Sequence, residues 1–163
     1  MHWTLISARR LAIAGLLLLL LYAFGTLLDG LARTFLSSPI GIVRDMAQPY
    51  IAMALSCCFP YGFVIRSNIV VTLLDPLLPA GASRGLAAFG WLVTLIIVGC
   101  FAYQFFQYAR ELQSAGETTA MYAVPTAPFW YLVALNFAFG AIVHLFTFKE
   151  WMASSGTEAG EHP

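Results

Sequence analysis

Long apolar stretches without a single charged residue alternate with short polar segments along this chain of 163 residues. The four stretches are Leu11–Leu28, Met46–Ile65, Leu86–Ala109 and Ala120–Phe148. A helix rises about 1.5 Å per residue, so roughly 20 residues cross a hydrocarbon core about 30 Å thick. Each stretch reaches or nearly reaches that length, and the remainder is too short for a soluble domain. The pattern therefore predicts an all-α integral membrane protein with four transmembrane helices.

Polar and helix-breaking residues set the expected limits of these helices. Ser37-Ser38-Pro39 ends the first helix, and Pro60 predicts a kink inside the second because proline lacks the backbone N–H. The last residues, 153–163, are small and polar, so we expect a disordered tail there. Within one membrane domain of residues 1–152, we expect spans over about 11–35, 44–66, 84–109 and 127–149.

Between the second and third spans, residues 68–78 have the pattern of a short amphipathic helix. Asn68, Thr72 and Asp75 fall at i, i+4 and i+7, opposite five Val and Leu residues. Such a helix lies in the plane of the membrane interface with its apolar face among the acyl chains. The same residues are also compatible with a tilted extension of the second span.

The distribution of Lys and Arg predicts the orientation in the membrane. Cytoplasmic loops carry an excess of basic residues, so the more basic side is expected inside the cell. With four spans, five basic residues share the side of the termini and three lie opposite: Arg9, Arg10, Arg66, Arg84 and Lys149 against Arg33, Arg44 and Arg110. We therefore expect both termini in the cytoplasm. The first apolar stretch is too long for a signal peptide and lacks an Ala-x-Ala cleavage pattern, so we expect it to be retained.

The composition of the chain provides few residues that could take part in catalysis or bind a cofactor inside the membrane. The chain is 60% hydrophobic and 10% charged with no formal net charge, which gives no indication of a nucleic-acid partner. No acidic or basic residue falls in the middle of a span, and no nucleophile–base pair or phosphate-binding glycine loop occurs. His144 is the only histidine within a span, and Cys57, Cys58 and Cys100 lack the spacing of a disulfide framework or zinc site. We expect no enzymatic activity, cofactor or metal.

One polar stripe remains in the fourth span. Asn136, Gly140, His144 and Thr147 recur at i, i+4, i+8 and i+11 and so share one helix face. Lipid offers no hydrogen bonds and glycine permits close approach, so this face should meet protein. Three surroundings are open: the other spans of the same chain, another subunit, or a path for a solute or proton.

Polar residues at the span ends form a second set of candidates. Asp29 and Arg33 stand at i and i+4 in the order that favours a helical ion pair, and Arg33 can reach the headgroups. Asp45 precedes the second span, and Arg66 and Asn68 follow it. Arg33, Asp45, Arg66 and Asn68 are therefore candidate contacts with lipid headgroups or with a partner subunit.

Several short motifs follow one another along the chain: Arg33-Thr34-Phe35, Pro39 with Asp45, Arg66-Ser67-Asn68-Ile69-Val70, Pro79, Gly116-Glu117-Thr118-Thr119 and Pro125-x-x-Pro128-x-Trp130. Their order resembles that of one family, the small permease subunit (DctQ-like, Q subunit) of tripartite ATP-independent periplasmic (TRAP) transporters. The resemblance covers roughly Leu11 to Trp151. It departs from the family pattern at Val43-Arg44-Asp45 and Ser67-Asn68-Ile69.

The resemblance implies a role as a transporter subunit in the bacterial inner membrane. In that family the small subunit binds a large multi-span (M-type) permease, which moves the solute with sodium, and a periplasmic binding protein delivers the solute. The small subunit would brace the immobile scaffold, and the solute would be an organic acid, a carboxylate or sulfonate. The alternatives are the small four-span subunit of a tripartite tricarboxylate transporter, an unrelated structural tetraspan protein, and a membrane redox or haem protein.

Overall fold

The computed structural model describes residues 2–38, 40–66 and 80–157, and over these residues it is helical apart from short connections. Four segments are long and apolar enough to cross a membrane: Thr4–Phe35, Ala47–Ile65, Gly85–Ala115 and Ala127–Glu150. The predicted all-α class with four spanning helices is thus confirmed. The predicted interfacial helix, residues 68–78, lies outside the described residues. The helices are α1 (His2–Leu36), α2 (Gly41–Asp45), α3 (Ala47–Ser56), α4 (Phe59–Arg66), α6 (Ala80–Ala115) and α7 (Ala127–Thr157).

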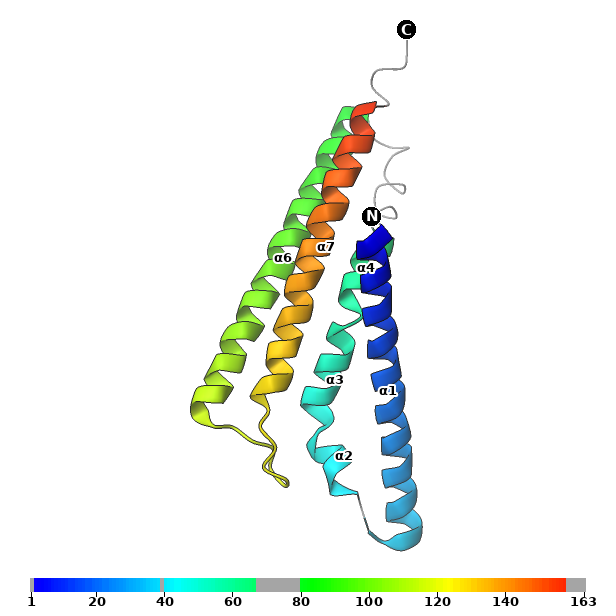
Figure 1. Ribbon diagram of the computed structural model, residues 1–163, viewed down its shortest axis with the longest axis vertical. Helices are drawn as coiled ribbons and strands as arrows, with labels where there is room; N and C mark the ends of the chain where they lie inside the picture. Colours follow the sequence, from blue (N-terminus) through cyan, green and yellow to red (C-terminus); the bar gives the residue numbers. More distant parts are fainter. Residues whose placement is uncertain (1, 39, 67–79, 158–163) are drawn as a thin grey trace.

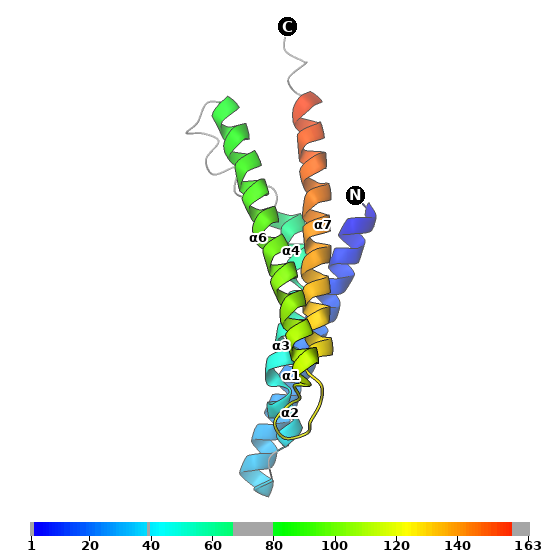
Figure 2. The same cartoon turned by 90° about the vertical axis from the view of Figure 1, so that its left-hand side faces the viewer.

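The helices stand side by side with their axes roughly parallel (Figure 1). α6 and α7 lie at one flank, α1 lies at the other, and α3 and α4 lie between α7 and α1. α6 and α7 diverge toward the end of the molecule at which α6 starts and α7 ends (Figure 2). The turn after α1 and the loop between α6 and α7 lie at the opposite end. This arrangement follows from four successive spans that alternate in direction.

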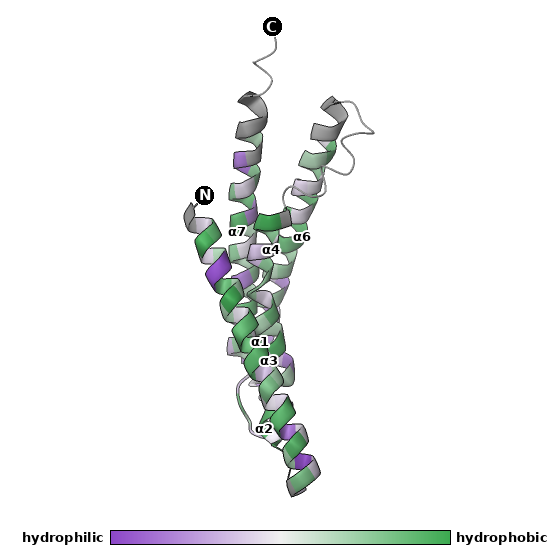
Figure 3. Cartoon of the chain, turned by 90° about the vertical axis from the view of Figure 1, so that its right-hand side faces the viewer, coloured by the Kyte–Doolittle hydropathy of each residue, from purple (hydrophilic) through white to green (hydrophobic). Residues whose placement is uncertain are grey.

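α7 is the central helix and α1 is the most peripheral. In the apolar window of α7, 39% of the residues are buried, against 11% in that of α1. The core is formed by Val98, Val133 and Phe137, where α6 meets α7. α1 is hydrophobic along most of its length and exposes many leucines (Figure 3). A soluble protein rarely exposes so large an apolar surface, so lipid or another protein must cover it.

The second span is broken where the sequence predicts a disturbance. α3 ends at Ser56, residues 57–58 form a turn, and α4 starts at Phe59. Pro60 has no N–H for the Ser56 carbonyl, and the Cys58 N–H instead reaches back to the Leu55 carbonyl at 3.0 Å. The predicted kink is therefore a break between two short helices.

The other helices are longer than the apolar stretches that identify them. α1 already begins at His2, α6 runs on to Ala115, and α7 reaches Thr157, which includes the first residues of the expected tail. Residues 158–163 of that tail lie outside the described part. The extensions contain no proline, so nothing in them interrupts the helix after it leaves the hydrocarbon region.

Candidate subunit-contact and anchoring sites

Asn136 on α7 joins this helix to the break in the second span. Its side-chain amide donates to the Ser56 hydroxyl at 2.8 Å and lies 3.2 Å from the Cys57 sulfur. Asn136 is 9% exposed and Ser56 is 1% exposed, so the contact is dry. The Ser56 hydroxyl in turn donates to the Met53 carbonyl at 2.7 Å. A buried polar group without a partner is costly in lipid, so this network fixes α7 against the junction of α3 and α4.

The next position of the stripe, Gly140, makes room for an aromatic ring from α4. A Cβ atom at this position would lie 3.3 Å from Cε2 of Phe63 and 3.7 Å from Cγ of Pro60. The absence of a side chain lets the Phe63 ring lie directly on the α7 backbone. From there the ring also contacts His144, with the ring centroids 5.4 Å apart. Gly140 therefore serves close packing between α7 and α4.

His144 faces the other neighbour of α7, helix α6. Its Nε2 lies 3.2 Å from the backbone carbonyl oxygen of Trp91, and its ring stacks on the Trp91 indole with centroids 4.3 Å apart. Because a carbonyl only accepts, Nε2 carries the hydrogen in this contact. Among the described residues, Nδ1 has no hydrogen-bond partner. The last member of the stripe, Thr147, donates to the Val143 carbonyl of its own helix at 2.9 Å.

The polar stripe thus lies among the helices of its own chain rather than along one open surface. Asn136 and Gly140 contact the second span, and His144 contacts α6. The sequence places these residues on one face of the helix, and the structure divides that face between two neighbours. Among the described residues, no group of three or more His, Cys, Asp or Glu side chains is close enough to hold a metal ion.

At the far end of α1, Asp29 makes the predicted ion pair and a second contact that the sequence does not reveal. Its Oδ2 accepts from Arg33 at 2.9 Å, which confirms the i, i+4 pair. Its Oδ1 accepts the Ile40 backbone N–H at 2.6 Å. Ser37, with φ of 53°, makes the left-handed turn that brings Ile40 back to the helix. Asp29 is therefore nearly buried, while the Arg33 side chain remains 52% exposed.

Asp45, at the end of α2, anchors the loop between α6 and α7. Its carboxylate accepts the backbone N–H groups of Met121, at 3.2 Å, and Tyr122, at 3.0 Å. Hydrogen bonding from the Thr119 hydroxyl, together with these amides, lowers the pKa of Asp45 below its ordinary value of 3.8 and outweighs the opposing effect of burial. The carboxylate is thus held ionised against a loop 76 residues away in the sequence.

The anchored loop is a small hairpin with its own hydrogen bonds. Gly116, with φ of 64°, ends α6 in the left-handed conformation that glycine adopts at low cost. Thr118 and Pro125 form an isolated bridge, and the Thr119 N–H donates to the Val124 carbonyl at 2.9 Å. The Thr119 hydroxyl accepts the Val124 N–H at 3.1 Å. We call residues 117–126 the α6–α7 hairpin.

A close contact at Gly15 brings α1 against the second span. A Cβ atom there would lie 2.6 Å from the Ala54 carbonyl oxygen and 2.7 Å from the Cys57 Cβ. Only glycine allows the two backbones this approach. The sequence does contain a signal for it, because Gly15 is the only glycine among the first twenty residues and interrupts a leucine-rich run.

Two candidates from the sequence are not placed in full. Arg66 is the last residue of α4, but its side chain is outside the described part, and Asn68 lies outside it altogether. The sequence also gives little warning of Ser56, Trp91 and the backbone of the hairpin. Each of them is a partner in a contact between distant segments, and nothing in its local pattern identifies that partner.

Comparison with protein families matches residues 22–153, which is most of the chain, to "Tripartite ATP-independent periplasmic transporters, DctQ component". Searches of the curated proteins and of the solved structures found no match. The resemblance drawn from the order of the motifs is therefore confirmed, and the family is a transporter component and not an enzyme. With four candidate spans and this match, the chain belongs to the DctQ family, the small membrane subunit of TRAP transporters.

Proposed function

We propose that this subunit braces the large M-type permease of a sodium-coupled transporter that takes up an organic acid, a carboxylate or sulfonate, from a periplasmic binding protein. Membership of the DctQ family supports the three-part assembly. The bracing role is supported by one observation: Asn136, Asp29 and Asp45 make their polar contacts with other residues of the same chain. A body held together by its own polar bonds can act as a fixed support while another subunit moves.

The proposed location is the bacterial inner membrane, with both termini in the cytoplasm. The five-to-three distribution of basic residues supports this orientation. In a variant without Cys57, Cys58 and Cys100, single cysteines at Ser7 and Ser114 test it. An impermeant thiol reagent added outside should label the cysteine at 114 and spare the one at 7. The reverse pattern would invert the orientation.

The proposed role predicts that the subunit is inert on its own. Proteoliposomes with the large permease, the binding protein and an inward sodium gradient should accumulate the organic acid. Vesicles that contain only this chain, with the same binding protein and gradient, should not. Uptake by this chain alone would refute the bracing role, because it would require a solute path within the chain.

We further propose that the polar residues at the span ends, Arg33, Asp45, Arg66 and Asn68, contact the large permease or lipid headgroups. Hydrophobicity alone does not drive two membrane proteins to pair, because lipid tails are as apolar as leucine. The Arg33 side chain is about half exposed despite its ion pair, which supports its candidacy. One polar contact contributes about 0.5–1.5 kcal/mol, so single substitutions should weaken the complex rather than abolish it.

The double variant Arg33→Ala/Arg66→Ala tests these contacts. It should lower copurification of the large permease and solute uptake in parallel, without lowering the amount of this chain in the membrane. The matched control is Arg10→Ala/Arg110→Ala, which removes one exposed arginine at each end of the molecule. If the test variant copurifies and transports like the control, these arginines only anchor the chain to headgroups.

A further inference from the structure

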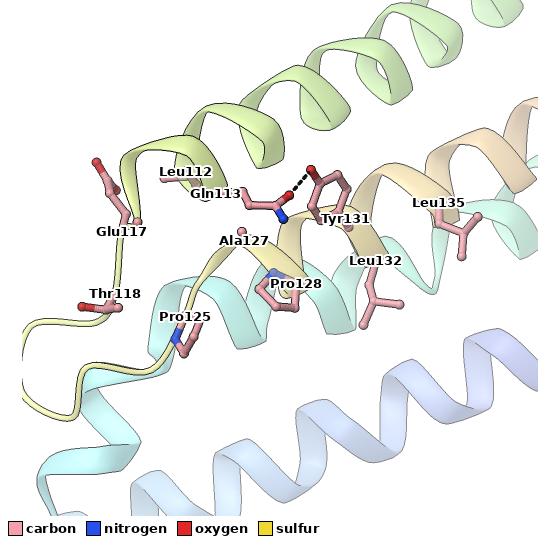
Figure 4. Close-up of a pocket in the computed structure, with 11 residues that line it drawn as sticks. Leu112, Gln113, Glu117, Thr118, Pro125, Ala127, Pro128, Tyr131, Leu132 and Leu135 are labelled. Carbon is pink, nitrogen blue, oxygen red and sulfur yellow. Dashed lines mark hydrogen bonds between the residues drawn. The ribbon is translucent and has the colours of Figure 1, made fainter.

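A groove opens where α6 ends and α7 begins (Figure 4). Its volume is about 690 Å³, within the range of about 300–1,000 Å³ typical of small-molecule sites. The last turn of α6, the α6–α7 hairpin and the first turns of α7 form its walls. Pro125 of the hairpin is one wall residue, and the hairpin itself is held in place by Asp45. The groove is therefore a shaped part of the fold and not a gap between mobile segments.

The groove is polar at its rim and apolar along its length. Glu117 and Thr118 stand at the hairpin end and point away from the helices, while Leu132 and Leu135 line the α7 side (Figure 4). The two leucines lie five and eight residues after the start of α7, or about 7.5 and 12 Å along the helix. They are 47% and 63% exposed. The groove thus passes from the headgroup level into the hydrocarbon region, as an amphiphile does.

The polar groups indicate which headgroup fits. The Tyr131 hydroxyl donates to Oε1 of Gln113 at 2.7 Å, which fixes the Gln113 amide at the rim and leaves its N–H groups for an acceptor. A phosphate or ester oxygen of a lipid is such an acceptor. Among the described residues that line the groove, Glu117 is the only charged one. An acidic rim without a basic residue favours a headgroup that carries a cation over one that is only anionic.

We propose that this groove binds one phospholipid with a primary amine in its headgroup, of the phosphatidylethanolamine type. Its acyl chains lie along Leu132 and Leu135, the Gln113 amide donates to its phosphate or ester oxygens, and the Glu117 carboxylate holds its ammonium. The lipid completes the bundle at the groove that α6, α7 and the hairpin enclose.

Native mass spectrometry of the full-length chain with equimolar phosphatidylethanolamine and phosphatidylglycerol of matched acyl chains tests the headgroup. An exposed ion pair contributes at most about 1 kcal/mol, so the parent should retain the amine lipid up to about fivefold over phosphatidylglycerol. Glu117→Gln should bring the ratio close to one. Glu111→Gln removes an exposed acid of α6 that does not line the groove and should keep the preference. Equal retention of both lipids by the parent would overturn the proposal.

Two further measurements test whether the lipid is bound in this groove. Leu135→Trp should fill the groove and lose the retained lipid, whereas Leu145→Trp, a change at an exposed leucine farther along α7, should not. Phosphatidylethanolamine with a photoreactive acyl chain should crosslink to the first turns of α7 around Leu132. Unchanged retention in Leu135→Trp, or crosslinks only elsewhere, would refute the site. Loss of these crosslinks when the large permease is copurified would assign the groove to a protein contact instead.

Discussion

The contact at Gly15 makes the sharpest prediction about the stability of this bundle. A methyl group at this position would lie 2.6 Å from the Ala54 carbonyl oxygen and 2.7 Å from the Cys57 Cβ, whereas ordinary contacts are 3.4–4 Å. Both obstacles belong to the backbone or to a Cβ, so no rotamer change can remove them. In Gly15→Ala, α1 must therefore withdraw from the second span by roughly 1 Å, and such a gap forfeits a quarter to a half of the dispersion attraction at the contact.

The same helix offers a matched control. Gly30→Ala adds the same methyl group to α1, where it meets no atom of another described segment within 4 Å. Both variants gain about 1 kcal/mol of helix propensity, so this gain cancels in the comparison. Overpacking of a closely packed contact costs about 1–3 kcal/mol. We expect Gly15→Ala to be less stable than Gly30→Ala by that amount.

Reversible unfolding in mixed micelles, titrated with dodecyl sulfate and followed by circular dichroism, measures the difference. Gly140→Ala should give an intermediate value, because the obstacle there is the Phe63 ring at 3.3 Å and a side chain can move aside. If Gly15→Ala and Gly30→Ala unfold within about 0.5 kcal/mol of each other, α1 is not packed as closely as the structure indicates. The explanation of Gly15 as a close-approach residue would then fail.

Three further predictions concern the polar anchors and the turn after α1. Asp45→Asn should increase the hydrogen exchange of the hairpin amides, because the ionised carboxylate protects them in the parent. In the parent the protection should be complete above about pH 3.8 and should be lost as the pH falls through the lowered pKa of Asp45. Asn136→Leu should lower the unfolding free energy by about 0.6–1.7 kcal/mol, whereas Thr147→Val should change it little because Thr147 bonds only its own helix. Ser37→Gly should raise the thermal midpoint, since it removes roughly 1 kcal/mol of left-handed backbone strain.

The four spans can be predicted from the sequence because the bilayer directly constrains the composition of any segment that crosses it. Hydrocarbon excludes charge, so a charge-free stretch of sufficient length is itself the signal. The helix ends are harder to predict, because outside the hydrocarbon region a helix continues until a helix-breaking residue ends it. α1 therefore starts well before Leu11, and α6 continues past Ala109 to the glycine at 116.

Local contacts were predictable and distant ones were not. The Asp29–Arg33 pair spans one helical turn, so its geometry follows from the helix alone. The bonds from Asp29 to Ile40 and from Asp45 to Met121 depend on how the chain turns and packs, and a carboxylate at a span end gives no indication of which backbone it will meet. Periodicity likewise shows that Asn136 and His144 share a face, but not that the face is divided between two neighbouring helices.

The few polar and close contacts explain how a chain with so little burial keeps one shape. Lipid surrounds exposed leucines as well as protein does, so the apolar faces of α1 and α6 contribute little to holding the helices together. Cohesion must come from dispersion at close contacts and from hydrogen bonds that lipid cannot replace. Between the α6–α7 pair and α1–α4 such contacts occur at two levels: Asn136 and Gly140 meet the second span near its break, and Asp45 meets the hairpin. Two separated contacts resist rotation of the α6–α7 pair against α1–α4, which a single contact would allow. The proposed bracing role requires this resistance.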